Sequence, residues 1–295
     1  MKQLSLYVFA LLLLASCGGS KKAIENKAQK QEVTQQTQTT EPVKEVVEEQ
    51  VERKEKVEKV KEFSNTNTET VKPLTEAKKP VEAFNHSSYH QLLQTHVSKE
   101  GNVDYDAIKN KRIVLTEYIS SLGENLPEDT WSKEDKLAYW INAYNALTID
   151  LILRHYPLNS IKDIKDPWKQ RFWQLGDKWY NLDEIEHQIL RKMDEPRIHF
   201  AIVCASFSCP KLQNEAFTAG NLEDQLTNAT EEFLSDTSRN EISEDNLKLS
   251  KIFKWFAKDF KTNGTLIDFL NQYSDIEISA KAKRSFKDYS WDLND

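Results

Sequence analysis

A long charged segment near the N-terminus confines the folded part of this chain to the residues that follow it. Residues 21–80 contain 12 Lys, one Arg and 12 Glu with no Asp, and Phe63 is their only aromatic side chain. Such a segment buries too little apolar surface to offset the conformational entropy lost on folding. We therefore expect residues 18–82 to form a disordered tether, with a transient helix or weak coiled coil through its valines as the alternative.

The first 17 residues have the three parts of a secretory signal. Lys2 precedes an apolar run over residues 4–14, and small residues lead to Cys17. As a helix this run is about 16 Å long, too short to span a bilayer. The sequence Leu14-Ala15-Ser16-Cys17 resembles the lipobox of bacterial lipoproteins. We expect a cell-envelope protein anchored to the membrane by a lipid on Cys17, at the periplasmic or outer-membrane face, with an ordinary signal peptide as the alternative.

The remaining residues, 83–295, form the part of the chain that is able to fold. They contain all seven Trp, and they carry 26 basic against 34 acidic residues, a net charge of −8. This length suits a single globular domain. An acidic domain argues against nucleic acid or anionic lipid as its partner.

Hydrophobic spacing predicts a mainly helical framework for this domain. The clearest apolar stripe lies over residues 132–154, where Ser132 and Asp135 resemble a capping box and Pro157 prevents further helix. Further helices are expected over residues 84–96, 104–122 with Gly123 as C-cap, 183–191 with Asp183 as cap, 222–234, 252–256 and 266–273.

The sequence predicts fewer strands than helices. Together they predict an α+β fold with helices packed on a small, mainly antiparallel sheet. Hairpins are expected over residues 173–180 and 241–249. The run 198–204 is the most strand-like, and its apolar character places it inside a sheet with Cys204 facing the following loop. The chain has no glycine-rich phosphate loop, and we expect no cofactor.

One cysteine and one histidine suggest thiol chemistry. Nucleophilic catalysis by cysteine needs a thiolate, a neighbouring imidazole to make it, and a third group that orients the imidazole. Cys204 at the end of the predicted strand, with His187 on the preceding helix, could supply the first two groups. A carboxylate or carboxamide would supply the third.

Four runs in this chain resemble a known family over the span 101–294. They are GNVDY at 101–105, EDKLAYWINAYNALT at 134–148, LDEIEHQILR at 182–191 and PRIHFAIVCASFSCP at 196–210. The chain resembles the family named domain of unknown function 547, whose members look like cysteine peptidases with a Cys, His and Glu triad. The resemblance implies Cys204 as nucleophile, His187 as base and Glu134 as carboxylate, in a papain-like or transglutaminase-like arrangement.

Each cysteine also has a structural interpretation. Cys204 and Cys209 could form a disulfide, because an exported protein lies in an oxidising compartment. Cys204 could instead be an inert buried thiol. Zinc binding by both cysteines with His187 and His199 is a further alternative, although the spacing matches no standard zinc motif.

The third group of the site has several candidates. Asn142 and Asn145 share a face of the long helix, where they could hold a loop, donate to an oxyanion or orient the imidazole. Glu186 is a further rival. Glu134 lies in the first turn of the same helix, where an acidic side chain favours the helix dipole in any case.

Other polar and aromatic residues near these motifs have supporting roles. We expect Arg191 and Arg197 to fix the loops around Cys204 through carboxylate pairs. Trp140 and Trp173 are expected in the core or in the wall of a cleft.

These observations predict a cell-envelope cysteine hydrolase that acts on a peptide or cell-wall amide through a thioester on Cys204. The alternative is a non-catalytic envelope module that binds a partner, with Cys204 and Cys209 joined in a disulfide.

Overall fold

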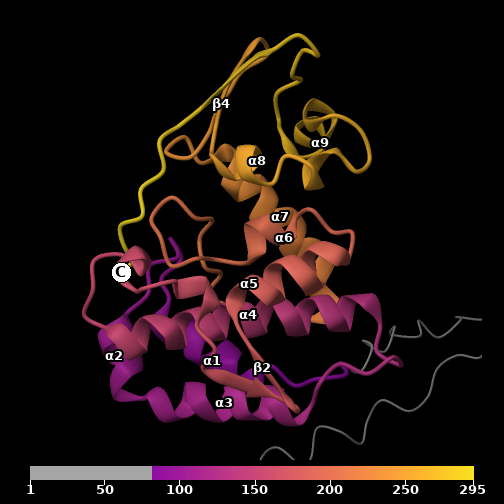
Figure 1. Ribbon diagram of the computed structural model, residues 1–295. Helices are drawn as coiled ribbons and strands as arrows, with labels where there is room; N and C mark the ends of the chain where they lie inside the picture. The colour runs from indigo at the N-terminus through magenta and orange to yellow at the C-terminus, as the bar shows by residue number, and fades with distance from the viewer. Residues whose placement is uncertain (1–81) are drawn as a thin grey trace, which may run out of the picture. The chain divides into compact units, whose positions relative to one another are not determined.

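A computed structural model describes residues 82–295, which lie in one compact unit with an α+β fold (Figure 1). The predicted fold class is therefore confirmed. The predictions for the signal segment, Cys17 and the tether lie outside the described residues. Within 82–295, none of the helices combines the length and the apolarity needed to cross a membrane.

The elements follow one another in a mainly helical order. The first half contains α1 (Ser87–His96), α2 (Tyr105–Asn110), α3 (Arg112–Glu124), α4 (Lys133–His155), β1 (Trp173–Leu175) and β2 (Lys178–Tyr180). The second half contains α5 (Leu182–Glu184), a π-helical turn η3 (Ile185–Ile189), a 3-10 turn η4 (Leu190–Lys192), α6 (Ile198–Ala201), α7 (Leu222–Ser235), β3 (Glu241–Ile242), β4 (Asn246–Leu249), α8 (Ile252–Trp255), a 3-10 turn η6 (Asp259–Lys261), α9 (Leu266–Tyr273) and β5 (Lys283–Phe286).

Helix α4 is the centre of the fold. The backbone N–H of Asp135 donates to the side chain of Ser132, which confirms the predicted N-terminus. Every residue from Leu137 to Leu153 is buried, so α4 is covered on all sides and not only along its apolar stripe. Figure 1 shows α4 between α1, α2 and α3 on one side and α5, α6 and α7 on the other.

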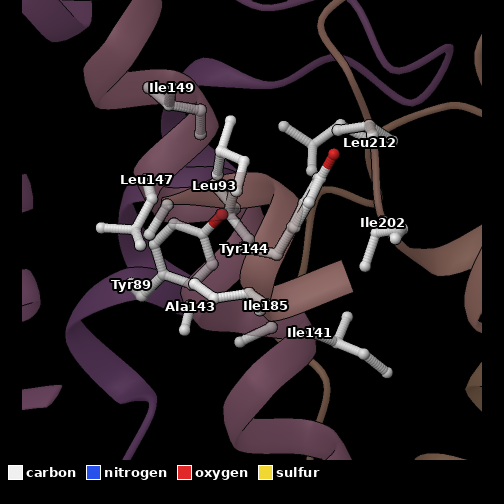
Figure 2. Packing of buried hydrophobic residues seen from close by; sticks show 14 of the residues in the cluster. Tyr89, Leu93, Ile141, Ala143, Tyr144, Leu147, Ile149, Ile185, Ile202 and Leu212 are labelled. Atoms are coloured by element: carbon white, nitrogen blue, oxygen red, sulfur yellow. The ribbon is translucent and has the colours of Figure 1, made fainter. Parts of the chain in front are cut away.

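The larger of two hydrophobic clusters surrounds α4. It joins α4 to α1 and α3, and Tyr89 of α1 stacks on Tyr118 of α3 with ring centroids 4.7 Å apart. Figure 2 shows Tyr144 of α4 among buried side chains from several segments, including Ile185 and Ile202.

The second cluster is built from aromatic rings of the C-terminal half. Phe200 packs against Phe233 of α7, Phe253 of α8 and Phe269 of α9. The three-stranded sheet in the order β3-β4-β5 belongs to this part, with β3 and β4 antiparallel and β4 and β5 parallel. The antiparallel hairpin of β1 and β2 forms a separate sheet, and both predicted hairpins are confirmed.

The prediction of a strand over 198–204 is wrong. Residues Ile198–Ala201 form α6, and the chain becomes extended only from Ile202. The run is apolar apart from His199 because it lies between the two clusters, with Phe200 in the second and Ile198 and Val203 in the first. A short apolar run signals burial and does not distinguish a strand from a buried helical turn.

Three helix boundaries also differ from the predictions. The helix expected over 104–122 is divided at Lys111 into α2 and α3. Gly123 lies inside α3 and not at its C-cap, and a Cβ there would come within 2.9 Å of the Gln174 carbonyl oxygen, so the glycine permits close approach of β1. Asn181, not Asp183, caps α5 by accepting the Glu184 N–H.

Asp150 joins α4 to its surroundings through ionic and hydrogen bonds. Its fully buried carboxylate accepts from Arg112 at 2.6 Å, from Arg154 at 2.7 Å and from the indole N–H of Trp173 at 2.7 Å. These bonds fix the start of α3, the end of α4 and the first strand of the hairpin.

We expect Asp150→Ala to lower the free energy of unfolding by about 3 kcal/mol, because two cations and a buried indole N–H lose their common acceptor. Urea denaturation of the full chain measures this loss. Asp106→Ala, at an exposed position on α2, is the control, with an expected change within about 0.5 kcal/mol. Equal effects of the two substitutions would contradict the role given to Asp150.

Candidate functional site

A cavity of about 640 Å³ opens between the two hydrophobic clusters. Its wall combines two cysteines, two histidines, a buried acid and an aromatic lining. The residues used below are Cys204, Cys209, His187, His199, Glu186, Tyr144, Tyr289, Trp168, Trp255, Phe256 and Trp291. Tyr289 packs against both clusters, so the cavity lies where they meet.

The segment that carries Cys204 is held by Asn145 of α4. The Asn145 amide donates to the Ala201 carbonyl at 2.9 Å, and its oxygen accepts the Val203 N–H at 3.0 Å. These two bonds satisfy the backbone where α6 ends. Ala205 then adopts a positive φ of 53°, which is uncommon for a residue with a side chain and turns the chain sharply after Cys204.

Cys204 and Cys209 are joined in a disulfide, one of the alternatives that the sequence left open. The hydroxyls of Ser206 and Tyr289 lie beside both sulfurs, and they are 3.0 Å from each other. Among residues 82–295 no group of three or more His, Cys, Asp and Glu side chains has the arrangement of a metal site.

The loop between the two cysteines is fixed from outside. The Phe207 N–H donates to the Asp292 carbonyl at 2.7 Å, so the C-terminal segment pairs with the loop. Arg239 donates to the carbonyl oxygens of Cys209 at 2.8 Å and Phe207 at 2.5 Å. The disulfide therefore belongs to a framework that also includes Arg239 and the C-terminal segment.

His187 lies on the π-helical turn η3, a rare conformation that often occurs at functional sites. Arg191 approaches His187 Nδ1 at 3.0 Å, and Asp183 lies 3.6 Å from Nε2. Because arginine only donates, Nδ1 must be the accepting nitrogen. Burial lowers the pKa of His187, Asp183 opposes this shift and Arg191 adds to it, so the ring is neutral at pH 7.

His199 forms a second imidazole site, paired with Asp259 of η6. Its Nε2 lies 2.9 Å from Asp259 Oδ2, and its ring stacks on Phe256. Burial lowers the pKa of His199, while Asp259 opposes the shift. Burial alone would raise the pKa of Asp259, but hydrogen bonds from Arg191 and His199 hold it well below the usual value. Asp259 is therefore an ionised acceptor that orients His199 through Nε2–H.

Glu186 is a buried acid in the same wall. Burial raises its pKa to about 7, although Arg191 and the hydrogen bond from Tyr144 lower it. The Tyr144 hydroxyl is 3.4 Å from Glu186 Oε2. Glu186 is thus balanced between its acid and its carboxylate near neutral pH, a property common in catalytic groups.

The other predicted site residues lie apart from this cavity. Glu134 borders a different, smaller pocket near Arg197. Asn142 clamps Phe217 by donating to its carbonyl at 2.7 Å and accepting its N–H at 3.0 Å. With Asn145 occupied by Ala201 and Val203, both amides serve the backbone in this structure.

The arginines form the expected carboxylate pairs, and the tryptophans lie in the core. Arg191 makes a two-bond pair with Asp259, and Arg197 binds Glu195 and Glu223. Trp140 and Trp173 are buried in the larger cluster and do not line the cavity.

Sequence reasoning missed Asp259 and Tyr289, because no local motif marks them. Each lies more than 50 residues beyond Cys204, and only the packing of the second cluster brings Tyr289 to the cavity wall and Asp259 to His199. The one sequence feature that could have drawn attention to them is the group of aromatic residues close by, Trp255 and Phe256 before Asp259 and Trp291 after Tyr289.

Part of this site lies in a segment that is similar to a known family. Residues 128–234 match the family model described as Protein of unknown function, DUF547. The matched residues include Cys204 and His187 and cover less than half of the chain, inside the 101–294 span that resembles this family. No curated protein and no solved structure matches the chain. The papain-like or transglutaminase-like arrangement therefore stays a prediction.

We expect Glu186→Gln to stabilise the protein above pH 7. The folded-state pKa of Glu186 is raised, so its stabilising contribution is present below the ordinary pKa and is lost as pH rises through about 7. At pH 8 the free energy of unfolding should increase by about 1 to 3 kcal/mol in the variant, with little change at pH 5. Chemical denaturation at both pH values measures the difference.

Glu184→Gln is the matched control for this experiment. Glu184 accepts a hydrogen bond from Arg171, which lowers its pKa, so its contribution is present above the ordinary pKa. Its substitution should therefore not stabilise the protein at pH 8. A stabilisation of equal size in both variants would contradict the burial argument for Glu186.

Proposed function

We propose that the cavity is the active site of a cysteine hydrolase in a lipid-anchored protein of the bacterial cell envelope, acting on a peptide or another amide bond. The observation that carries the proposal is the placement of Cys204 in one cavity wall with two neutral imidazoles, His187 and His199. A thiol with a neutral base in the same cavity is the arrangement that acyl transfer to sulfur requires.

The reaction begins from the reduced form of Cys204. An imidazole accepts the thiol proton, and the sulfur attacks the carbonyl carbon of the amide. The C–N bond then breaks, the imidazolium returns its proton to the leaving amine, and a thioester remains on Cys204. Water activated by the same imidazole hydrolyses the thioester and restores the thiol.

Two histidines compete for the role of base. The sequence favours His187, but its Nδ1 lone pair accepts from Arg191, so it takes a proton only when this contact opens. His199 has Nε2–H directed to Asp259, which leaves Nδ1 as its unprotonated nitrogen. The order nucleophile, imidazole and carboxylate supports Cys204, His199 and Asp259 as the triad.

The negative charge of the tetrahedral intermediate needs donors near the sulfur. Asn142 and Asn145 are bound to backbone groups and are therefore poor candidates. The hydroxyls of Ser206 and Tyr289 lie 3.3 and 3.4 Å from the Cys204 sulfur, which makes them the available side-chain donors.

A second candidate function is a non-catalytic module that binds a protein or cell-wall partner. The disulfide favours it, because a closed pair leaves Cys204 without a free thiol. The aromatic lining of the cavity suits a binding site as well as an active site.

We expect the reduced full-length protein to be acylated on Cys204 by p-nitrophenyl acetate, a generic acyl donor. His199→Ala or His187→Ala, whichever removes the base, should slow acylation by about 100-fold. His155→Ala, on the far end of α4 and outside the cavity wall, is the control. Mass spectrometry locates the acetyl group, and release of p-nitrophenol gives the rate.

Acylation that neither histidine substitution slows would contradict the enzyme. In that case, a Cys204–Cys209 disulfide in protein isolated from the cell envelope would favour the binding module.

We expect Cys17→Ser to release the protein from the membrane, because the lipid on Cys17 is the anchor that the sequence predicts. Cell fractionation and immunoblotting measure the distribution. The Cys204→Ser variant is the control, since it removes a cysteine but keeps the anchor. Membrane retention of a folded Cys17→Ser protein would show that another element holds it.

A further inference from the structure

The two sulfurs of the disulfide lie in unequal surroundings. Cys204 is half-buried in the cavity wall, whereas Cys209 is only 4% exposed. An incoming thiol therefore reaches the Cys204 sulfur more readily. Thiol–disulfide exchange depends on which sulfur is accessible and on how well the other leaves as a thiolate.

Hydrogen-bond donors favour Cys209 as the leaving sulfur. The backbone N–H of Cys204 donates to Cys209 Sγ at 3.1 Å, the Tyr289 hydroxyl lies at 3.1 Å and the Ser206 hydroxyl donates at 3.4 Å. Around the Cys204 sulfur the hydrogen-bond partners within residues 82–295 are the same two hydroxyls, at 3.3 and 3.4 Å. The backbone N–H serves Cys209 alone.

These donors stabilise a thiolate more than a thiol, because each hydrogen bond strengthens with negative charge on the acceptor. Burial opposes them, since removal from water disfavours the thiolate. The Cys204 N–H and the Tyr289 O–H face the buried Cys209 sulfur. These protein donors replace the water that a thiolate at Cys209 would otherwise need.

We propose that the Cys204–Cys209 disulfide is a directional exchange site for thiols, with Cys204 as the attacked sulfur and Cys209 as the leaving thiolate. A substrate thiolate attacks Cys204 Sγ, the bond between the two cysteine sulfurs breaks, and its electron pair remains on Cys209. The product is a mixed disulfide on Cys204, while Cys209 accepts hydrogen bonds from the three donors and is later protonated.

A second thiolate completes the reduction. It attacks the substrate sulfur of the mixed disulfide and releases a disulfide of the two substrate thiols and the free Cys204 thiolate. Two thiols are thereby oxidised by two electrons and one protein disulfide is reduced. This exchange needs no histidine base, so it does not rest on the proposed hydrolysis, although it provides a route to the thiol that hydrolysis requires.

Tyr289 is the positioning residue that distinguishes this site from an ordinary disulfide. Its ring packs on Trp255 and Trp291, and its hydroxyl lies beside both sulfurs. Burial raises its pKa to about 12, so the hydroxyl keeps its proton over the neutral range and stays a donor.

The test treats oxidised full-length protein with a limited amount of glutathione, followed by an acid quench and alkylation of free thiols. Mass spectrometry then identifies the cysteine that carries glutathione. We expect the adduct on Cys204 at least about tenfold over Cys209, with Cys209 alkylated. An adduct on Cys209, or an equal distribution, overturns the proposal.

A tyrosine variant tests the donor. Tyr289→Phe keeps the ring and removes the O–H, so exchange should slow by about threefold to tenfold. Tyr273→Phe, on α9 and without contact to either sulfur, is the control. An unchanged rate in folded Tyr289→Phe, with folding checked by thermal unfolding, would remove Tyr289 from the mechanism.

If Tyr289→Phe fails to fold, single-cysteine variants still test which of the two cysteines is the leaving thiolate. Cys204→Ser retains the backbone N–H at residue 204 and leaves Cys209 free, whereas Cys209→Ser leaves Cys204 free. The pH dependence of thiolate absorbance should give a lower pKa for the Cys209 thiol than for the Cys204 thiol. The reverse order would overturn the assignment of Cys209 as leaving group. Because acylation is measured on reduced protein and exchange on oxidised protein, failure of one function does not imply failure of the other.

Discussion

The burial of α4 on all sides is the constraint on which the rest of the structure depends. A buried helix offers no water to its polar side chains, so each of them must find a hydrogen-bond partner in the protein. Asn142 and Asn145 each hold a backbone segment with two hydrogen bonds, and Asp150 holds the β1 hairpin and two arginines. Among these polar residues of α4, Asn145 positions the segment that carries Cys204.

The cavity follows from the way two hydrophobic clusters meet. One cluster contains α4 and the segment before Cys204, and the other supplies Phe256 and the neighbourhood of Asp259. The disulfide, the two imidazoles and the buried acid at this junction all come from residues 186–209, whereas Tyr144 and Tyr289 reach it from distant parts of the sequence. Burial at this junction shifts the pKa of Glu186 and of both histidines towards neutral forms, which suits proton transfer near pH 7.

The two proposed functions meet at the same sulfur. Hydrolysis needs a free Cys204 thiol, whereas the structure has this sulfur bonded to Cys209. An exchange site in which Cys209 leaves would connect the two states by ordinary thiol chemistry. The loop that carries both cysteines is fixed by Arg239 and by the C-terminal segment, so the donors around the sulfurs do not depend on the loop alone.

Periodicity and capping in the sequence alone determined the α+β class, the long helix α4 and both hairpins, because these signals act within a few residues. The sequence also identified Cys204 and His187 as candidates for one site. Only the tertiary structure decided that Ile198–Ala201 is helical, that Glu134 lies outside the cavity, that Tyr289 lines it and that Asp259 pairs with His199. The physical reason is that burial and hydrogen-bond partners depend on contacts between distant segments, which no local pattern encodes.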